Sequence, residues 1–172
     1  SSIGIVDLAK LTASLEESKA LKEQLLKQRD ESQKKLTELK EELNSVGKIL
    51  DGMKEKKGTP EYLKQLATKY ELENTYKARG EGLQQLIDIN EGENMKTMFL
   101  KVADAVNRIG KDRGYDLVLW DDRSITPPTN PATGAQVWNV IRDRRILYAS
   151  DRVDLTNDVL TLMNNEYKAG KK

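Results

Sequence analysis

Residues 58–60, Gly-Thr-Pro, separate two stretches of about fifty residues that contain no proline and are rich in good helix formers. Glycine can close a helix in the left-handed conformation, a threonine hydroxyl can cap the next helix, and proline suits a first helical turn. Gly58, Thr59 and Pro60 therefore predict a tight turn between two long helices. The tip of the resulting hairpin is expected near 57–60.

The first stretch carries a coiled-coil repeat from Leu8 onward. Its steps alternate strictly between three and four residues, and ten of the fourteen positions are Leu, Val or Met: 8, 11, 15, 18, 22, 25, 29, 32, 36, 39, 43, 46, 50 and 53. A 3.5-residue repeat keeps one narrow apolar stripe facing a partner helix. Four polar residues weaken this stripe in its middle: Ser18, Lys22, Arg29 and Ser32.

A second stripe runs from Tyr62 to Ile109 and is also interrupted by polar residues, among them Lys69, Glu73, Asn90 and Asn94. Reversal of the chain at 58–60 aligns the two stripes antiparallel, with Leu36 near Leu83. Each arm of 45–50 residues would be roughly 70 Å long at 1.5 Å per residue. Since each helix buries only one stripe, the arms should be loosely packed.

The two ends of the chain read as β structure. Residues 3–7 are short, alternating and β-branched, and Gly114 ends the second helix just before the apolar run 115–120. Segments 137–141 and 146–149 are further expected strands. A short final helix is expected to start at Asp154 or Thr156, with an apolar face of Leu155, Val159, Leu162 and Met163.

These elements predict an α+β fold, mostly α, in which a long antiparallel helical hairpin projects from a small β-body. The body comprises residues 1–10 and 114–172, and the hairpin comprises residues 11–113. Residues 122–137 hold three of the four prolines, which predicts an extended insertion.

Composition excludes several classes of site. The chain has no cysteine and no histidine, so a disulfide framework, a Cys/His zinc site and a histidine-based triad are ruled out. The 29 basic and 28 acidic residues nearly cancel, which gives no reason to expect a nucleic-acid partner. Nothing in this inventory indicates an enzyme, a cofactor or a metal.

Two charged clusters remain. Arg142, Arg144 and Arg145 could bind a phosphate or a lipid headgroup, but Asp143 and Asp151 are near enough to make a solvated or salt-bridged surface the preferred interpretation. The adjacent carboxylates at 121 and 122 are interpreted as a solvated turn rather than an active site.

Three stretches resemble the Skp/OmpH family of periplasmic chaperones: IGIVDLAKL at 3–11, GYDLVL at 114–119 and ILYASDRVDLTNDVLTLMN at 146–164. The order of strand, long hairpin, strands and short helix matches the family over nearly the whole chain. The resemblance implies a homotrimer in which strands from three subunits form a β-body and three hairpins hang from it as tentacles around a cavity. It further implies a periplasmic location, with a removed signal peptide, and ATP-independent holding of unfolded outer-membrane proteins. It also implies contact with lipid or lipopolysaccharide. The best-known members are strongly basic, whereas the arms of this chain are nearly neutral, so electrostatic attraction gives this contact little support here.

Apolar residues outside the apolar stripes, or near the hairpin tip, are the candidates for contact with unfolded clients. They are Leu21, Leu26, Met53, Tyr62, Leu63, Tyr70, Leu72 and Leu86. For each of them, the alternative is packing within the hairpin or exposure as a single apolar group without a partner. The apolar residues of the expected strands are assigned to the sheet and the trimer interface: Ile3, Ile5, Leu117, Leu119, Ile146 and Tyr148.

A second function is compatible with the sequence. The chain could be a structural coiled-coil scaffold or spacer whose hairpin packs on a fixed partner. A permanent scaffold favours a continuous apolar stripe. The polar interruptions therefore favour a holder of unfolded proteins.

Overall fold

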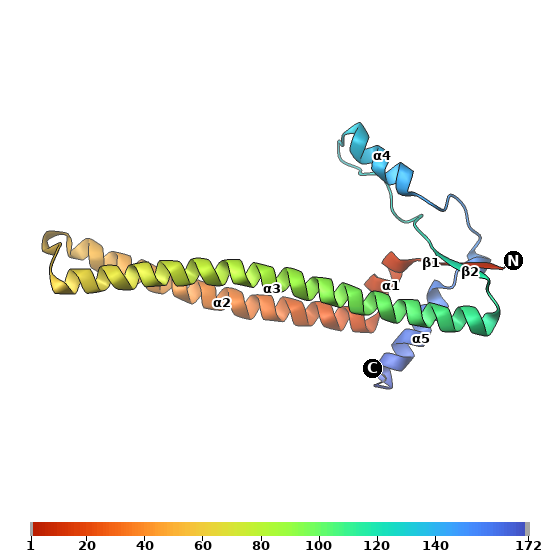
Figure 1. The fold of residues 1–172 in the computed structure, drawn as a ribbon, viewed down its shortest axis with the longest axis horizontal. Coiled ribbons are helices and arrows are strands. Elements are labelled where there is room, and N and C mark those ends of the chain that lie inside the picture. The colour runs from red at the N-terminus through yellow and green to blue at the C-terminus, as the bar shows by residue number, and fades with distance from the viewer. Residues whose placement is uncertain (1, 171–172) are drawn as a thin grey trace. The chain divides into compact units, whose positions relative to one another are not determined.

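The computed structural model describes residues 2–170 and is mostly helical, with long helices and one small sheet (Figure 1), which confirms the predicted fold class. The described chain divides into two compact units. One contains the residues up to Leu21 together with those from Asn94 onward. The other contains residues 22–93 and is called the arm unit below.

The arm unit is a hairpin of two helices, α2 (Glu16–Gly52) and α3 (Pro60–Arg113), which run side by side and antiparallel in it (Figure 1). A short 3₁₀ turn, Lys54–Lys56, leads into the reversal. Gly58 adopts a left-handed φ of 86°, and the Thr59 hydroxyl accepts a 3.3 Å hydrogen bond from the Tyr62 N–H. Pro60 is the first residue of α3, so the predicted tip is confirmed.

The arm unit has almost no core. Within 22–93, every residue of which is described, only Leu36 and Leu50 are buried. Leu36 and Leu83 line the same hollow between the helices, as the predicted antiparallel alignment requires. The hairpin therefore depends on helix propensity and on one thin contact stripe, because two helices cannot bury a continuous interior.

The other unit, called the body below, contains the sheet. Strand β1 (Ile3–Val6) pairs in parallel with β2 (Leu117–Trp120), and Ile3 lies opposite Leu117. Both strands were expected from the sequence. The left-handed φ of Gly114, 73°, ends α3 and lets the chain turn into β2, as predicted.

Short helices complete the core of the body. Helix α1 (Leu8–Ser14) follows β1, and α5 (Thr156–Lys168) packs beside it. Two contacts hold the start of α5 at the end of β1: the Leu155 N–H donates to the Ile5 carbonyl at 2.9 Å, and the Asp7 N–H donates to the Thr156 hydroxyl at 2.9 Å. Within the start of α5, the Thr156 N–H donates to the Asp154 carboxylate at 2.8 Å. The core formed around these elements contains Val6, Leu11, Leu15, Met98, Val102, Ala105, Ile109, Leu155, Val159 and Met163.

The first helix is interrupted where the sequence repeat predicts continuity. Leu15 leaves the helical conformation, with ψ at 129°, and separates α1 from α2. The break buries the Leu15 side chain in the body, and Asn164 of α5 accepts a 3.0 Å hydrogen bond from the Glu16 N–H at the start of α2. Tertiary packing therefore overrides the local helical pattern.

Two expected strands are wrong. Residues 137–141 lie in a helix, α4 (Gly134–Asp143), because Thr133 and Gln136 form a reciprocal capping box at its start. Residues 146–149 form no strand: Leu147 lies in a bend, and the segment belongs to no ladder within the described chain. Their backbone groups bond to side chains instead: Asp122 accepts from the Ile146 N–H, and Arg123 donates to the Ala149 carbonyl.

Candidate binding surfaces

Four of the predicted contact residues stand on the exposed surface of the arm unit. Leu26 comes from α2, and Leu63, Tyr70 and Leu86 come from α3. Each has about half of its side chain in water, where a large apolar group gains nothing unless a partner covers it. These four residues are called the exposed arm set below.

Three more predicted residues are half-buried in the hairpin: Met53 at the tip, Tyr62 and Leu72. The structure places Leu21 differently, since this side chain packs against the core of the body. Leu21 thus serves the body in this structure and is not grouped with the exposed arm set.

One member of the exposed arm set, Leu86, lines a hollow between the two helices. Its volume is 430 Å³, and it is lined by apolar and basic side chains: Lys35, Leu36, Arg79, Leu83 and Leu86, with Ser32 and Gly82. A second hollow of 230 Å³ lies nearby and shares Leu83 and Leu86 with the first. Shallow, mixed surfaces of this kind suit weak contact with many chains better than tight binding of one ligand.

The two long helices carry further exposed apolar residues that were not among the predicted contact residues. Ile49 and Ile89 belong to the arm unit, and Met95, Phe99 and Leu100 to the part of α3 in the body. All five lie off the apolar stripes. Applying the same off-stripe criterion along both full helices would have found them.

The residues assigned to the sheet and trimer interface divide into two groups. Ile5 and Ile146 are buried within the chain. Ile3, Leu117 and Leu119 remain about half exposed on the two-stranded sheet, and Tyr148 is 85% exposed beside Leu147 at 86%. The body therefore leaves much of its apolar strand surface uncovered.

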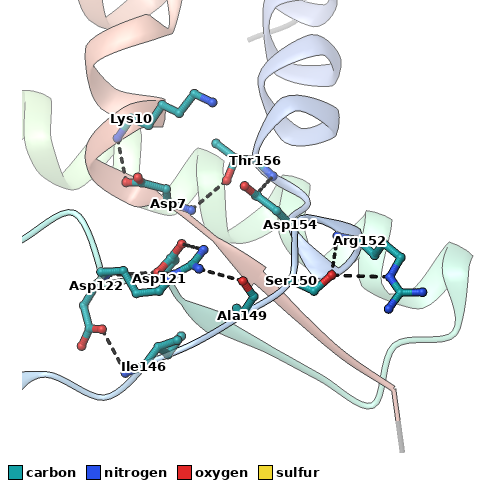
Figure 2. Close-up of polar contacts among 11 residues, drawn as sticks. Asp7, Lys10, Asp121, Asp122, Ile146, Ala149, Ser150, Arg152, Asp154 and Thr156 are labelled. Atoms are coloured by element: carbon teal, nitrogen blue, oxygen red, sulfur yellow. Dashed lines mark hydrogen bonds and ion pairs between the residues drawn. The ribbon is translucent and has the colours of Figure 1, made fainter.

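Asp121 and Asp122 are both buried, so the interpretation of 121 and 122 as a solvated turn is wrong. Asp122 accepts hydrogen bonds from the backbone N–H of Ile146 (Figure 2) and from that of Arg145. Asp121 pairs with the Arg123 guanidinium at 2.8 Å. Hydrogen bonds from Arg123 hold the pKa of Asp121 below its ordinary value. Asp122 thus satisfies the backbone N–H groups of Arg145 and Ile146. Asp121 holds Arg123, whose guanidinium donates to the Ala149 carbonyl.

In the arginine cluster, only Arg142 forms an ion pair of the expected kind within the described chain, and the other two guanidinium groups donate to backbone carbonyls. Arg142 pairs with Asp143 at 3.0 Å, and this contact raises the pKa of Arg142 and lowers that of Asp143. Arg144 donates to the Ile125 carbonyl, and Arg145 donates to the Arg142 carbonyl at 3.1 Å.

Several titratable groups elsewhere in the body form ion pairs with one another. A hollow of 280 Å³ beside α5 is lined by charged residues that pair with each other: Lys101 with Glu17, and Arg108 with Glu166. Hydrogen bonding to Glu166 raises the pKa of Arg108. Over residues 2–170, no group of carboxylates is placed to hold a metal ion. Over the same residues, no helix is both long and apolar enough to cross a bilayer.

Comparison with known proteins agrees with this architecture. The profile of the family described as outer membrane protein (OmpH-like) matches residues 2–163. A solved structure of an OmpH-like outer membrane chaperone candidate from Caulobacter crescentus CB15 has a similar fold, with a TM-score of 0.76 at 14% sequence identity. That similarity covers 96% of this chain and 85% of the other. No curated protein matches the sequence. Because the family profile spans nearly all of the chain, the protein belongs to the OmpH-like outer membrane protein family.

Proposed function

We propose that the protein is an ATP-independent periplasmic holdase, a chaperone that shields unfolded outer-membrane proteins between its helical arms. The observation that carries this proposal is the arm unit: 72 consecutive residues, 22–93, with two buried side chains and large apolar groups on the outside. A client must be released as well as held, and many weak apolar contacts allow both. The exposed arm set, with Met53, Tyr62 and Leu72, is the proposed contact surface.

The proposal includes a homotrimer. A two-stranded sheet is marginal by itself, and Ile3, Leu117, Leu119 and Tyr148 offer apolar surface for strands of other copies. The segment 145–149 lies outside any helix and is held from one side by Asp122 and Arg123. Closed symmetric assembly of three such bodies would cover this surface and place three arm units around one space.

Membership of the OmpH-like family supports the chaperone assignment. The presence of a separate body and hairpin supports a model in which the body mediates assembly and the hairpin contacts clients. The alternative is a scaffold that packs on a fixed partner. The near absence of a core in the arm unit favours the holdase, since a permanent contact would favour a continuous apolar stripe.

The test is suppression of aggregation. A urea-unfolded β-barrel protein is diluted into buffer without nucleotide, and turbidity is followed at increasing concentrations of the full chain. A holdase suppresses turbidity at a near-stoichiometric ratio of trimer to client. Unchanged turbidity would reject the holdase and leave the scaffold.

A further inference from the structure

Three ion pairs join helices α2, α3 and α5 in the part of the body from which the hairpin starts. Each pair bridges two of these helices, so that all three are linked pairwise: Glu17 of α2 with Lys101 of α3, Arg108 of α3 with Glu166 of α5, and Lys168 of α5 with Glu16 of α2. These six residues, all of them in the body, form a closed ring that is called the root collar below. Four of them line the 280 Å³ hollow beside α5.

Two of the three links in the root collar are better than ordinary surface ion pairs. Arg108 and Glu166 form two parallel hydrogen bonds, at 2.6 and 2.9 Å, which is the geometry that strengthens a guanidinium–carboxylate pair. The side chains of Glu17 and Lys101 are 18% and 35% exposed, so solvent screens their attraction only in part. A linked set of this kind has more weight than an isolated pair on the surface.

Apolar packing does little to hold the two hairpin helices together beyond the root collar. Leu15 is the last buried residue before α2, and the next buried residue along that helix is Leu36. On α3, no residue from 60 to 97 is buried, and Met98 is the first that is. The root collar therefore lies where the core of the body ends, and its ion pairs are the last strong contacts between α2 and α3 before a stretch without buried side chains.

We propose that the root collar is a salt-sensitive latch, which holds α2 and α3 together where the hairpin starts and lets them separate when its ion pairs are weakened. Dissolved ions screen charges that solvent reaches, so added salt weakens the links. Because the links form a ring, the loss of one removes support from the other two. Opening of the latch is therefore expected to spread to all three helices.

The consequence for clients rests on the proposed holdase function. Many weak contacts hold a client together because each contact raises the effective concentration for the next one. Helices that separate at the start of the hairpin present these contacts less closely to one another. An open latch should therefore release a client faster than a closed one.

A passive role is the alternative. Exposed ion pairs often contribute little, and the three pairs would then only fix α5 on the body. The two roles differ in the place where weakening is felt. A latch loosens residues 16–21 of α2 and 94–101 of α3, whereas a passive set loosens α5 alone.

The experiment is amide hydrogen exchange of the full chain, measured by mass spectrometry at low and at high sodium chloride. We expect exchange at 16–21 and 94–101 to rise severalfold with salt. At low salt, Lys101→Glu should raise it by about fivefold or more, because this change sets two carboxylates against each other. The exchanged pair, Lys101→Glu with Glu17→Lys, should recover most of the protection. Lys101→Gln removes the charge without repulsion and should give a smaller rise, which keeps the test valid if Lys101→Glu does not fold.

Glu73→Lys is the matched control. It breaks the ion pair of Glu73 with Lys69, which lies within α3 and joins no two helices. This variant should leave exchange at 16–21 and 94–101 unchanged. Release of a labelled, unfolded β-barrel protein, measured at one salt concentration, should be severalfold faster from Lys101→Glu than from the native chain or from Glu73→Lys.

The latch is overturned if neither salt nor a Lys101 variant changes exchange at 16–21 and 94–101, or if Glu73→Lys changes it equally. Loosening confined to α5 would assign the root collar to the passive role. A chain that suppresses no aggregation but opens at these residues with salt would keep the latch and lose the holdase. Faster exchange of Lys101→Glu with a native rate of client release would overturn the effect on clients.

Discussion

The buried carboxylate of Asp122 accepts a 3.0 Å hydrogen bond from the backbone N–H of Ile146, 24 positions later in the chain (Figure 2). The same carboxylate accepts from the Arg145 N–H. One side chain thus closes the base of the segment that carries α4 and fixes the backbone at Arg145 and Ile146.

Replacement of Asp122 by alanine should lower the free energy of unfolding by about 2 kcal/mol or more, because two backbone N–H groups lose their acceptor and the one at Ile146 is buried. Urea unfolding followed by circular dichroism measures the change. Asp30→Ala, at an exposed position of α2, is the control and should stay within about 0.5 kcal/mol of the native chain. Equal losses in both variants would show that Asp122 has no special part in the body.

The neighbouring Asp121 gives the body a dependence on acid. Hydrogen bonds from Arg123 lower its folded pKa below the ordinary value of 3.8, so its stabilising effect is complete above that pH and is lost as the pH falls through the folded pKa. Asp121→Asn should therefore be less stable than the native chain at pH 7, by about 1–2 kcal/mol, and the gap should close in strong acid. Urea midpoints measured from neutral pH downward test this; a gap that is constant with pH would contradict it.

Gly58 at the hairpin tip and Gly80 within α3 should respond in opposite ways to substitution by alanine. Gly58 has φ at 86°, a conformation that costs a side chain about 1 kcal/mol or more, so Gly58→Ala should destabilise the arm unit. Gly80 lies inside α3 with nothing within 4 Å of an added Cβ, so Gly80→Ala should stabilise it by about 0.5–1 kcal/mol. Amide hydrogen exchange in the arms measures both, and effects of the same sign would contradict the tip geometry.

The exposed strand surface of the body predicts the oligomeric state. Light scattering of the native chain should give three times the mass of one chain. Tyr148→Asp should shift the mass toward the monomer, since Tyr148 is exposed in the single chain and its replacement would charge only the proposed interface. Leu86→Asp, an equally drastic change on the arm unit, should leave the trimer intact. A native monomer would remove the shared body from the proposal.

Short-range sequence patterns were enough to predict the long helices and the hairpin tip, whereas contacts between residues far apart in the chain determine the rest of the fold. Gly58, Thr59 and Gly114 act through their own backbone and neighbours, so the tip and the end of α3 could be predicted. The break at Leu15 depends on Asn164, and the burial of Asp122 depends on Arg145 and Ile146, partners that no local pattern reveals.

The sequence prediction was wrong at helix α4 for a different reason. Its capping box, Thr133 and Gln136, was present in the sequence, but the prolines before it and the β-branched residues within it favoured a loop and a strand. Among the predicted contact residues outside the apolar stripe, Leu26, Leu63, Tyr70 and Leu86 are exposed. Leu21 packs against the body, which is built from distant parts of the chain and could not be foreseen from a local pattern.

The most direct test of the holdase replaces the exposed arm set in one variant: Leu26→Ser, Leu63→Ser, Tyr70→Ser and Leu86→Ser. Its control carries four substitutions of exposed glutamines in the same helices, Gln24→Ser, Gln28→Ser, Gln33→Ser and Gln85→Ser, which match the effect on helix propensity. In the aggregation assay, the concentration needed to halve turbidity should rise about tenfold for the first variant and stay near the native value for the second. Equal activity of both variants, with both still trimeric and helical, would contradict capture of unfolded chains by the arms.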